Sequence, residues 1–282
     1  MPLTAAELLQ DAEIPTLPEI FYRLEAAINN PYSNLADIAS ILAADTGLAA
    51  RILKIANSSL FSFPASIETV SQAISVVGTQ QLRELVLSTY VMRVFEGIPI
   101  DLVDMNAFWR HSIACGVGAR VIAAYRRETN IERFYLLGLL HDIGRLVLYL
   151  RQPESAAQAL RASQAQCRYL VDLESEMIGI DHAEVGAALL ALWRLPESLQ
   201  EPVRYHHRPG SAGLYPDEAA VVHFADILAN ALQLGSSGVC MVPEADVGSW
   251  ARVGLPVSQL ANVIENMERQ YADAVEIFTR DL

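Results

Sequence analysis

The sequence contains little cysteine, with only three in 282 residues. Cys115, Cys167 and Cys240 are odd in number, lie far apart and show no C-x-x-C spacing. Disulfide frameworks use even sets of cysteines, and cysteine zinc sites use closely spaced pairs. The pattern therefore favours neither of these, and it indicates a protein of the reducing cytoplasm.

Signals for secretion or membrane insertion are also missing. No charge-free apolar run reaches the roughly 18 residues that a membrane-spanning helix needs. The N-terminal stretch MPLTAAE lacks the basic start and the apolar segment of a secretory signal peptide. We therefore expect a cytoplasmic protein that does not contact a membrane.

Positive charge is scarce. Lysine and arginine together number 20, against 33 aspartates and glutamates, and the formal net charge is −13. Proteins that bind the phosphate backbone of DNA need clustered lysine and arginine. This balance argues against DNA as a partner.

Alternating runs of β-branched residues, which are typical of strands, are few. The sequence is instead 52% hydrophobic and rich in alanine and leucine. Its apolar residues recur at helical spacing, for example over 35–44 and 47–57, where Asn34 and Asp45 are placed to cap the helices. We therefore expect an all-α protein.

Three longer helices are also predicted. Residues 104–127 and 131–150 each read as one helix, and Asp104 is placed to cap the first of them. Residues 257–278 form an amphipathic helix, whose apolar stripe should pack on the body of the protein or on a second protomer.

A histidine and an aspartate, His141 and Asp142, stand side by side in the apolar run 138–148. A buried carboxylate is costly unless it is paired, hydrogen-bonded or bound to a metal. Neutral imidazole is a common metal ligand, so the pair suggests a metal site. Taken alone, it fits equally well a helix terminus at which Asp142 caps the helix and His141 is half exposed.

The other histidines surround this pair in one order. Histidine occurs only six times, and five of the six form a series with two aspartates. The candidate metal ligands are, in chain order, His111, His141, Asp142, His182, His206, His207 and Asp226. Seven residues in one series are a far more specific signal than a single pair.

Two positions in this series have simpler explanations when taken alone. His111 also fits a packed core residue, with Cys115 one turn further along the same helix face. His223 lies one turn before Asp226, and is either a neighbour of the site or a solvent-facing residue.

The remaining histidines lie near predicted helix ends. Asp181 and Glu184 predict a capping box, which places His182 in the first turn of a helix. His206 and His207 fall where a helix should end, and polar side chains at a helix C-terminus need no metal to explain them.

Several stretches of the sequence resemble known families. Leu17-Pro18, DTGLAARILKIANS at 45–58 and AISVVG at 73–78 resemble the HDOD family, the HD-related output domain of bacterial signalling proteins, over about residues 14–231. The histidine and aspartate series resembles the ligand set of binuclear members of the HD superfamily of metal-dependent phosphohydrolases. YHHRP at 205–209, followed by GLYP at 213–216, resembles a degraded HD-GYP signature.

These resemblances imply an arrangement of domains and a cofactor. A multi-helix HD-like domain is expected at 101–235, preceded by a smaller helical subdomain at 1–100 and followed by a helical extension at 236–282. One or two divalent transition metal ions are expected, with Asp142 bridging between them. Histidine and carboxylate ligands suit Fe, Mn or Zn.

The resemblance to HDOD proteins implies a regulatory role in bacterial signal transduction. Such a protein acts by binding other signalling proteins, and a homodimer or a nucleotide or phosphate ligand is compatible with this role. The first third of the chain has no histidine or cysteine, which fits a docking module. We expect this regulatory role, with a metal bound.

The alternative is a metal-dependent phosphohydrolase or phosphodiesterase that acts on a nucleotide or a cyclic dinucleotide. Asp142 and Arg145 would then be the catalytic residues. Arg145 stands where HD-GYP proteins usually have lysine, and it either holds a phosphate or is a solvated surface residue. Arg208 replaces the usual glutamate, and GLYP replaces Gly-Tyr-Pro. Both departures weaken the expectation of cyclic-dinucleotide hydrolysis.

Overall fold

The computed structural model describes residues 3–10, 14–58, 66–95, 98, 103–239 and 241–279. Within these ranges every regular element is a helix and no strand is present, so the predicted all-α class is confirmed. None of the described helices combines the length and apolarity needed to cross a membrane. Cys115 and Cys167 are free thiols, while Cys240 lies outside the described residues.

The chain divides into two compact units. The larger comprises Met1–Pro15 and Phe95–Met267, and the smaller comprises Thr16–Val94 and Glu268–Leu282. The functional boundaries expected near residues 100 and 235 stay a prediction.

The smaller unit is a set of short helices with well-defined caps. Its helices are α2 (Glu19–Asn29), α3 (Leu35–Ala43), α4 (Thr46–Ala56), α5 (Val70–Val77), α6 (Thr79–Val94) and the C-terminal part of α16 (Leu260–Thr279). The side chain of Asn34 accepts N–H groups of α3, and Asp45 accepts the Leu48 N–H at 2.9 Å. Gly78, with φ of 93°, separates α5 from α6.

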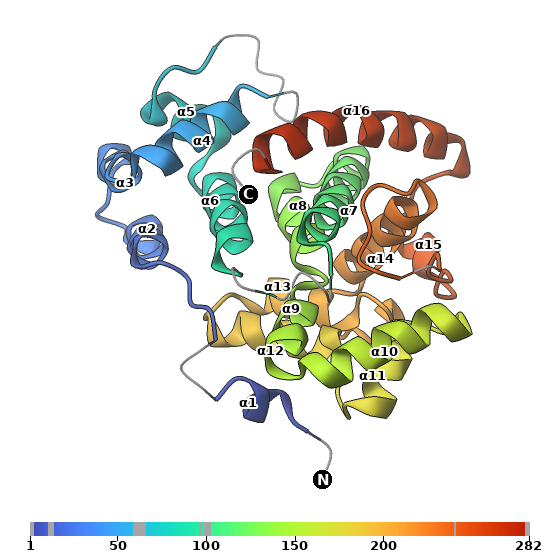
Figure 1. Cartoon of the computed structure of the whole chain (residues 1–282). Helices are drawn as coiled ribbons and strands as arrows, with labels where there is room; N and C mark the ends of the chain where they lie inside the picture. Colours follow the sequence, from blue (N-terminus) through green and yellow to red (C-terminus); the bar gives the residue numbers. More distant parts are fainter. Residues whose placement is uncertain are drawn as a thin grey trace. The chain divides into compact units, whose positions relative to one another are not determined.

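The larger unit is built around α7 (Met105–Arg126), which Asp104 caps as predicted. Helices α8 (Ile131–Leu140) and α14 (Pro216–Ala231) pack along α7 (Figure 1). A second group consists of α9 (Ile143–Arg151), α12 (His182–Leu192) and α13 (Glu197–Tyr205), in which α12 contacts both of the others. The remaining helices of this unit are α1 (Ala5–Leu8), α10 (Pro153–Gln166), α11 (Leu170–Met177) and α15 (Ser249–Val253), with 3-10 turns η1 (Pro209–Ser211) and η2 (Val257–Gln259).

The prediction of one helix over 131–150 is wrong, because the chain breaks between α8 and α9. His141 and Asp142 form the turn, and Asp142 has φ of −97° and ψ of 6°. Neither proline nor glycine occupies the break, so the sequence gives no local signal for it. The alternative is right that the pair lies at a helix terminus, with Asp142 at the N-cap position of α9, but it is wrong about the half-exposed histidine and the capping bond. Both side chains are buried, and Asp142 makes no side-chain capping bond.

Two glycines explain why the helices on either side of this turn diverge. A Cβ at Gly138 of α8 would overlap the Cys115 carbonyl of α7, and a Cβ at Gly144 of α9 would overlap the His182 carbonyl of α12. Glycine therefore allows α8 to lie close against α7 and α9 to lie close against α12. The turn carrying His141 and Asp142 is held between these two contacts.

Candidate metal centre

All seven predicted ligands come together in the larger unit, in two groups. His111 lies on α7, Asp226 on α14, and His182 is the first residue of α12. The first group is His111, Cys115, His141 and Asp226, and the second is Asp142, His182, His206 and His207; within each, the candidate ligand atoms lie within 4.8 Å of one another.

The first group centres on one oxygen of Asp226. Asp226 Oδ1 lies 3.1 Å from His111 Nε2 and 3.7 Å from His141 Nε2. It also accepts a hydrogen bond from Asn230 Nδ2 at 2.7 Å. Cys115 Sγ lies 3.5 Å from His111 Nε2. Cys115 was not among the predicted ligands, although its spacing of four residues from His111 placed it on the same helix face.

The second group centres on Asp142 and two imidazoles. Asp142 Oδ1 lies 3.2 Å from His182 Nε2 and 3.9 Å from His206 Nε2. His207 Nε2 lies 2.9 Å from His182 Nε2. The pair that follows α13 therefore turns both of its rings towards Asp142 and His182.

Asp142 lies between the two groups. Its Oδ1 atom faces His182 and His206, while its Oδ2 atom lies 3.4 Å from His141 Nε2 of the first group. One carboxylate therefore presents an oxygen to each group. A carboxylate that bridges two metal ions needs this placement.

Three of the imidazoles are oriented by hydrogen bonds at Nδ1. His141 Nδ1 donates to the Gly138 carbonyl and His206 Nδ1 to the Val203 carbonyl, both at 2.7 Å. A carbonyl only accepts, so Nδ1 carries the proton and Nε2 keeps its lone pair for a metal. His182 Nδ1 lies 2.5 Å from Glu174 Oε2, which also accepts the His182 backbone N–H at 3.0 Å.

Several polar atoms at the centre are buried and make no hydrogen bond, although Asp142 lies within ion-pair distance of Arg145 and His182. Asp142 Oδ1 and Oδ2, His141 Nε2 and His206 Nε2 have no hydrogen-bond partner in the part of the chain that the structure describes. Asp142 is only 1% exposed. Unsatisfied buried carboxylate and imidazole atoms are costly, and a cation that they coordinate removes that cost. The residues present therefore fit a metal centre.

The protonation states of most of these side chains also suit metal ligands. Burial raises the pKa of Asp142, but the Arg145 guanidinium and His141 outweigh it and hold the pKa well below its usual value. Burial likewise raises the pKa of Asp226, but the hydrogen bond with His111 outweighs this effect and the pKa falls to about 2. Burial, together with neighbouring histidines, lowers the pKa of His206 to about 3. Both carboxyl groups are therefore ionised and His206 is neutral at pH 7.

His182 differs from His206. Burial lowers the pKa of His182, but the carboxylate of Glu174 outweighs it and raises the pKa to about 9. Without a metal, the His182 ring is therefore a cation between Glu174 and Asp142, and a metal ligating through Nε2 displaces that proton.

Arg145 supports the centre from inside the protein. It is 4% exposed, so the interpretation as a solvated surface residue is wrong. Its Nε lies 3.2 Å from Asp142 Oδ1, and its NH1 group donates to the Ser237 carbonyl at 3.0 Å. Arg145 therefore holds Asp142 in place.

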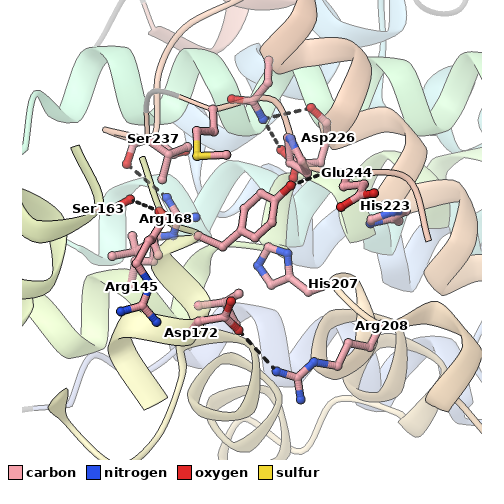
Figure 2. Close-up of a pocket in the computed structure, with 17 residues that line it drawn as sticks. Arg145, Ser163, Arg168, Asp172, His207, Arg208, His223, Asp226, Ser237 and Glu244 are labelled. Carbon is pink, nitrogen blue, oxygen red and sulfur yellow. Dashed lines mark hydrogen bonds and ion pairs between the residues drawn. The ribbon is translucent and has the colours of Figure 1, made fainter. Parts of the chain in front are cut away.

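A cavity of about 210 Å³ opens beside the centre. Asp226 and His207 reach it from the two groups, and Arg145 forms part of its wall (Figure 2). His223 lines it as well but belongs to neither group. It is 2% exposed and its Nε2 accepts the Asp246 N–H at 3.0 Å, so the solvent-facing alternative for His223 is wrong. A small solute in this cavity lies next to both groups of candidate ligands.

Comparison with known proteins decides the family. The sequence profile of the HDOD domain matches residues 14–209. The chain belongs to the HDOD family. The resemblance expected from residues 45–58 and 73–78 is thereby confirmed.

Two solved structures are similar to nearly the full length of the chain. An HDOD domain protein of unknown function from Geobacter sulfurreducens matches with a TM-score of 0.80 and 25% identity, covering 97% of both chains. A protein named "Putative phosphohydrolase" from Shewanella amazonensis matches with a TM-score of 0.75 and 26% identity, covering 96% of this chain and 97% of that one.

An uncharacterised protein of Treponema pallidum is 29% identical over 220 residues. That alignment covers 76% of this HDOD chain but only 42% of the relative. The chain thus spans about two fifths of the length of this longer protein.

Proposed function

We propose that this HDOD protein is a bacterial signalling regulator that acts through protein interaction, with divalent transition metal bound at its HD-type centre. His111, His141 and Asp226 hold one ion, and His182, His206 and His207 hold a second, with Asp142 shared. The observation that carries this proposal is the convergence of two groups of buried candidate ligands on Asp142, whose oxygens, like His141 Nε2 and His206 Nε2, make no hydrogen bond among the described residues. Nitrogen and oxygen donors of this kind suit Fe, Mn or Zn.

The smaller unit supports the regulatory part of the proposal. Its described residues contain no group of candidate metal ligands. Large apolar side chains are nevertheless exposed on it, with Tyr32 93%, Leu35 48% and Val76 49% accessible. A unit with exposed apolar side chains and no group of candidate metal ligands among its described residues is consistent with a docking site for a signalling partner.

A second candidate function, phosphoester hydrolysis, is favoured by the cavity that meets the centre. Two bound metals lower the pKa of a water and clamp a phosphoryl group. The residues of this chain would position the reaction: Arg145 fixes Asp142, and Arg208 adds positive charge at the cavity wall. The Shewanella neighbour, named as a phosphohydrolase candidate, supports this alternative.

One experiment tests the metal centre and separates the two functions. The purified chain, dialysed against Fe²⁺, Mn²⁺ or Zn²⁺ and then against metal-free buffer, is assayed for bound metal and for hydrolysis of nucleotides, a chromogenic phosphodiester and cyclic dinucleotides. We expect up to two ions per chain and no turnover. Asp142→Asn should lose metal, whereas Asp172→Asn, a half-exposed residue at the cavity outside both groups, should retain it.

The outcomes are distinct. Metal binding with turnover that Asp142→Asn abolishes establishes the hydrolase and overturns the purely regulatory role. Wild-type protein that holds no more metal than Asp142→Asn overturns the metal centre itself, and with it both functions as stated.

A further inference from the structure

A cysteine lies inside the first group of candidate ligands. Cys115 is fully buried on α7, one turn after His111. Its Sγ lies 3.5 Å from His111 Nε2 and 3.8 Å from Asp226 Oδ1. A second observation points to the same spot: His141 Nε2 is buried, has no hydrogen-bond partner, and lies 3.7 Å from the same Asp226 oxygen.

We propose that Cys115 is a thiolate ligand of the first metal site, which makes this site a selective one for Zn²⁺ or Fe²⁺. The inference rests on the proposed metal centre and names a further ligand within it. The two sites then differ in kind, since the second group offers only imidazole and carboxylate.

The ligand-atom separations within the first group are close to those of neighbouring ligands on one zinc ion, to which the shared Asp142 would add a fifth ligand. Zinc bonds of about 2.0–2.3 Å at tetrahedral angles place neighbouring nitrogen and oxygen ligands roughly 3.4 Å apart, and sulfur roughly 3.6 Å from either. Four of the six separations among His111, Cys115, His141 and Asp226 run from 3.1 to 3.8 Å, and the remaining two are within 4.8 Å. The side chains therefore already enclose a space of the right size for one ion.

A neutral thiol that simply donates to Asp226 explains these contacts less well. Asp226 Oδ1 already accepts from Asn230 at 2.7 Å and lies 3.1 Å from His111 Nε2. The sulfur is 3.8 Å away, near the upper end of the range for a hydrogen bond from a thiol. This alternative also leaves His141 Nε2 unsatisfied. Metal ligation would use both the Cys115 sulfur and His141 Nε2. One metal–sulfur bond would form, and the thiol proton would pass to solvent.

The thiolate has a consequence for metal choice. Soft sulfur ligands select Zn²⁺ and iron over the harder Mn²⁺ and Mg²⁺. Loss of even an outer partner of a metal ligand costs about 10- to 100-fold in affinity. Cys115→Ser should therefore weaken zinc binding at the first site by at least roughly tenfold, and manganese binding much less.

Cobalt spectroscopy tests the proposal on the whole chain. In a Cys167→Ser, Cys240→Ser background, Cys115 is the only thiol left of the three cysteines. Anaerobic titration with Co²⁺ should produce a near-ultraviolet thiolate-to-cobalt charge-transfer band that saturates at one ion per chain. Adding Cys115→Ser should abolish the band while bound cobalt remains detectable at the second site.

X-ray absorption of the zinc-loaded wild-type chain gives a readout that does not depend on any variant folding. We expect one sulfur at about 2.3 Å from a zinc ion. Bound cobalt without the band, and a zinc shell of nitrogen and oxygen alone, would overturn the role of Cys115 and leave the metal centre standing. Failure of the wild-type chain to bind either ion would overturn both.

Discussion

At the scale of single residues, the centre depends on side chains that would not touch the metal. Glu174 of α11 is 3% exposed and engages both the ring and the backbone N–H of His182. This contact fixes the direction of the ring and increases the basicity of the ligating nitrogen. No feature of the sequence marks Glu174, because it lies in a different helix from its partner.

The role of Glu174 leads to a prediction. Glu174→Gln keeps the size of the side chain but removes the charge that orients His182. We expect metal affinity at the second site to fall by about 10- to 100-fold, with the first site unchanged. Competition against a chelator of known affinity measures this loss. Glu184→Gln, an exposed change in α12, is the matched control, and equal affinities for the two variants would contradict the prediction.

At the scale of helices, the sequence predicted most elements and some of the caps. Asn34, Asp45 and Asp104 cap helices as their side-chain chemistry indicated, since capping depends only on residues within one turn. The break at His141 and Asp142 could not be predicted in this way. It arises from the close approach of α8 to α7 and of α9 to α12, which involves residues far apart in the chain.

In the candidate site, too, some features could be predicted from the sequence and others depend on how distant helices pack. The order of the histidines and aspartates was enough to predict that seven side chains meet. The sequence did not reveal that Arg145 is buried against Asp142, that Glu174 orients His182, or that Cys115 completes the first group. Each of these facts depends on which helices pack together rather than on local sequence.

The close contact between α9 and α12 can be tested directly. In Gly144→Ala the new methyl group would overlap the His182 carbonyl, so the helices must separate. We expect a loss of at least about 1 to 3 kcal/mol in the free energy of unfolding, together with weaker metal binding, because His182 and Asp142 move apart. Denaturant unfolding and metal titration measure the two effects. Gly210→Ala, where a Cβ would make only ordinary van der Waals contact with Asp246, should behave as wild type.

The cap of α4 gives a prediction about pH. The Leu48 N–H lowers the pKa of Asp45, and burial only partly opposes this. A lowered pKa in the folded state means that the carboxylate stabilises the fold above its unfolded pKa of about 4, and that this contribution is lost as the pH falls through the folded value. Asp45→Ala should therefore cost about 1 kcal/mol at pH 7 and less at pH 3.

Asp45→Asn is the control for the pH effect, because asparagine caps a helix without a charge. At pH 7 the unfolding free energy of Asp45→Asn should lie near that of the wild type. The difference in unfolding free energy between Asp45→Asn and Asp45→Ala should be the same at pH 3 and pH 7. A cost for Asp45→Ala that is the same at pH 3 and pH 7 would show that the Asp45 charge contributes nothing.

At the scale of the whole molecule, both groups of candidate metal ligands found among the described residues lie in the larger unit. All candidate ligands and the cavity belong to it, whereas the smaller unit holds no candidate ligand group among its described residues. Helix α16 contributes residues to both units. A regulator in which one part binds metal and another part binds a partner has this distribution.

Metal binding should also be visible in the stability of the whole chain. A ligand present at 100 times its dissociation constant adds about 2.7 kcal/mol to the folded state. For a chain of this size, that corresponds to a rise in Tm of roughly 5 to 10 °C over chelator-treated protein. Calorimetry with and without Zn²⁺ measures the shift. An equal shift in Asp142→Asn would mean that zinc stabilises the protein from somewhere else.

The turn between α8 and α9 has a consequence for how the centre fills. Asp142 belongs to neither helix, and each of its two oxygens faces a different group of ligands. In the proposed centre, two ions that share one carboxylate cannot load independently, and the coupling free energy is the same whichever ion enters first. A titration should therefore deviate from two independent sites, and withdrawing one ion should change the dissociation rate of the other.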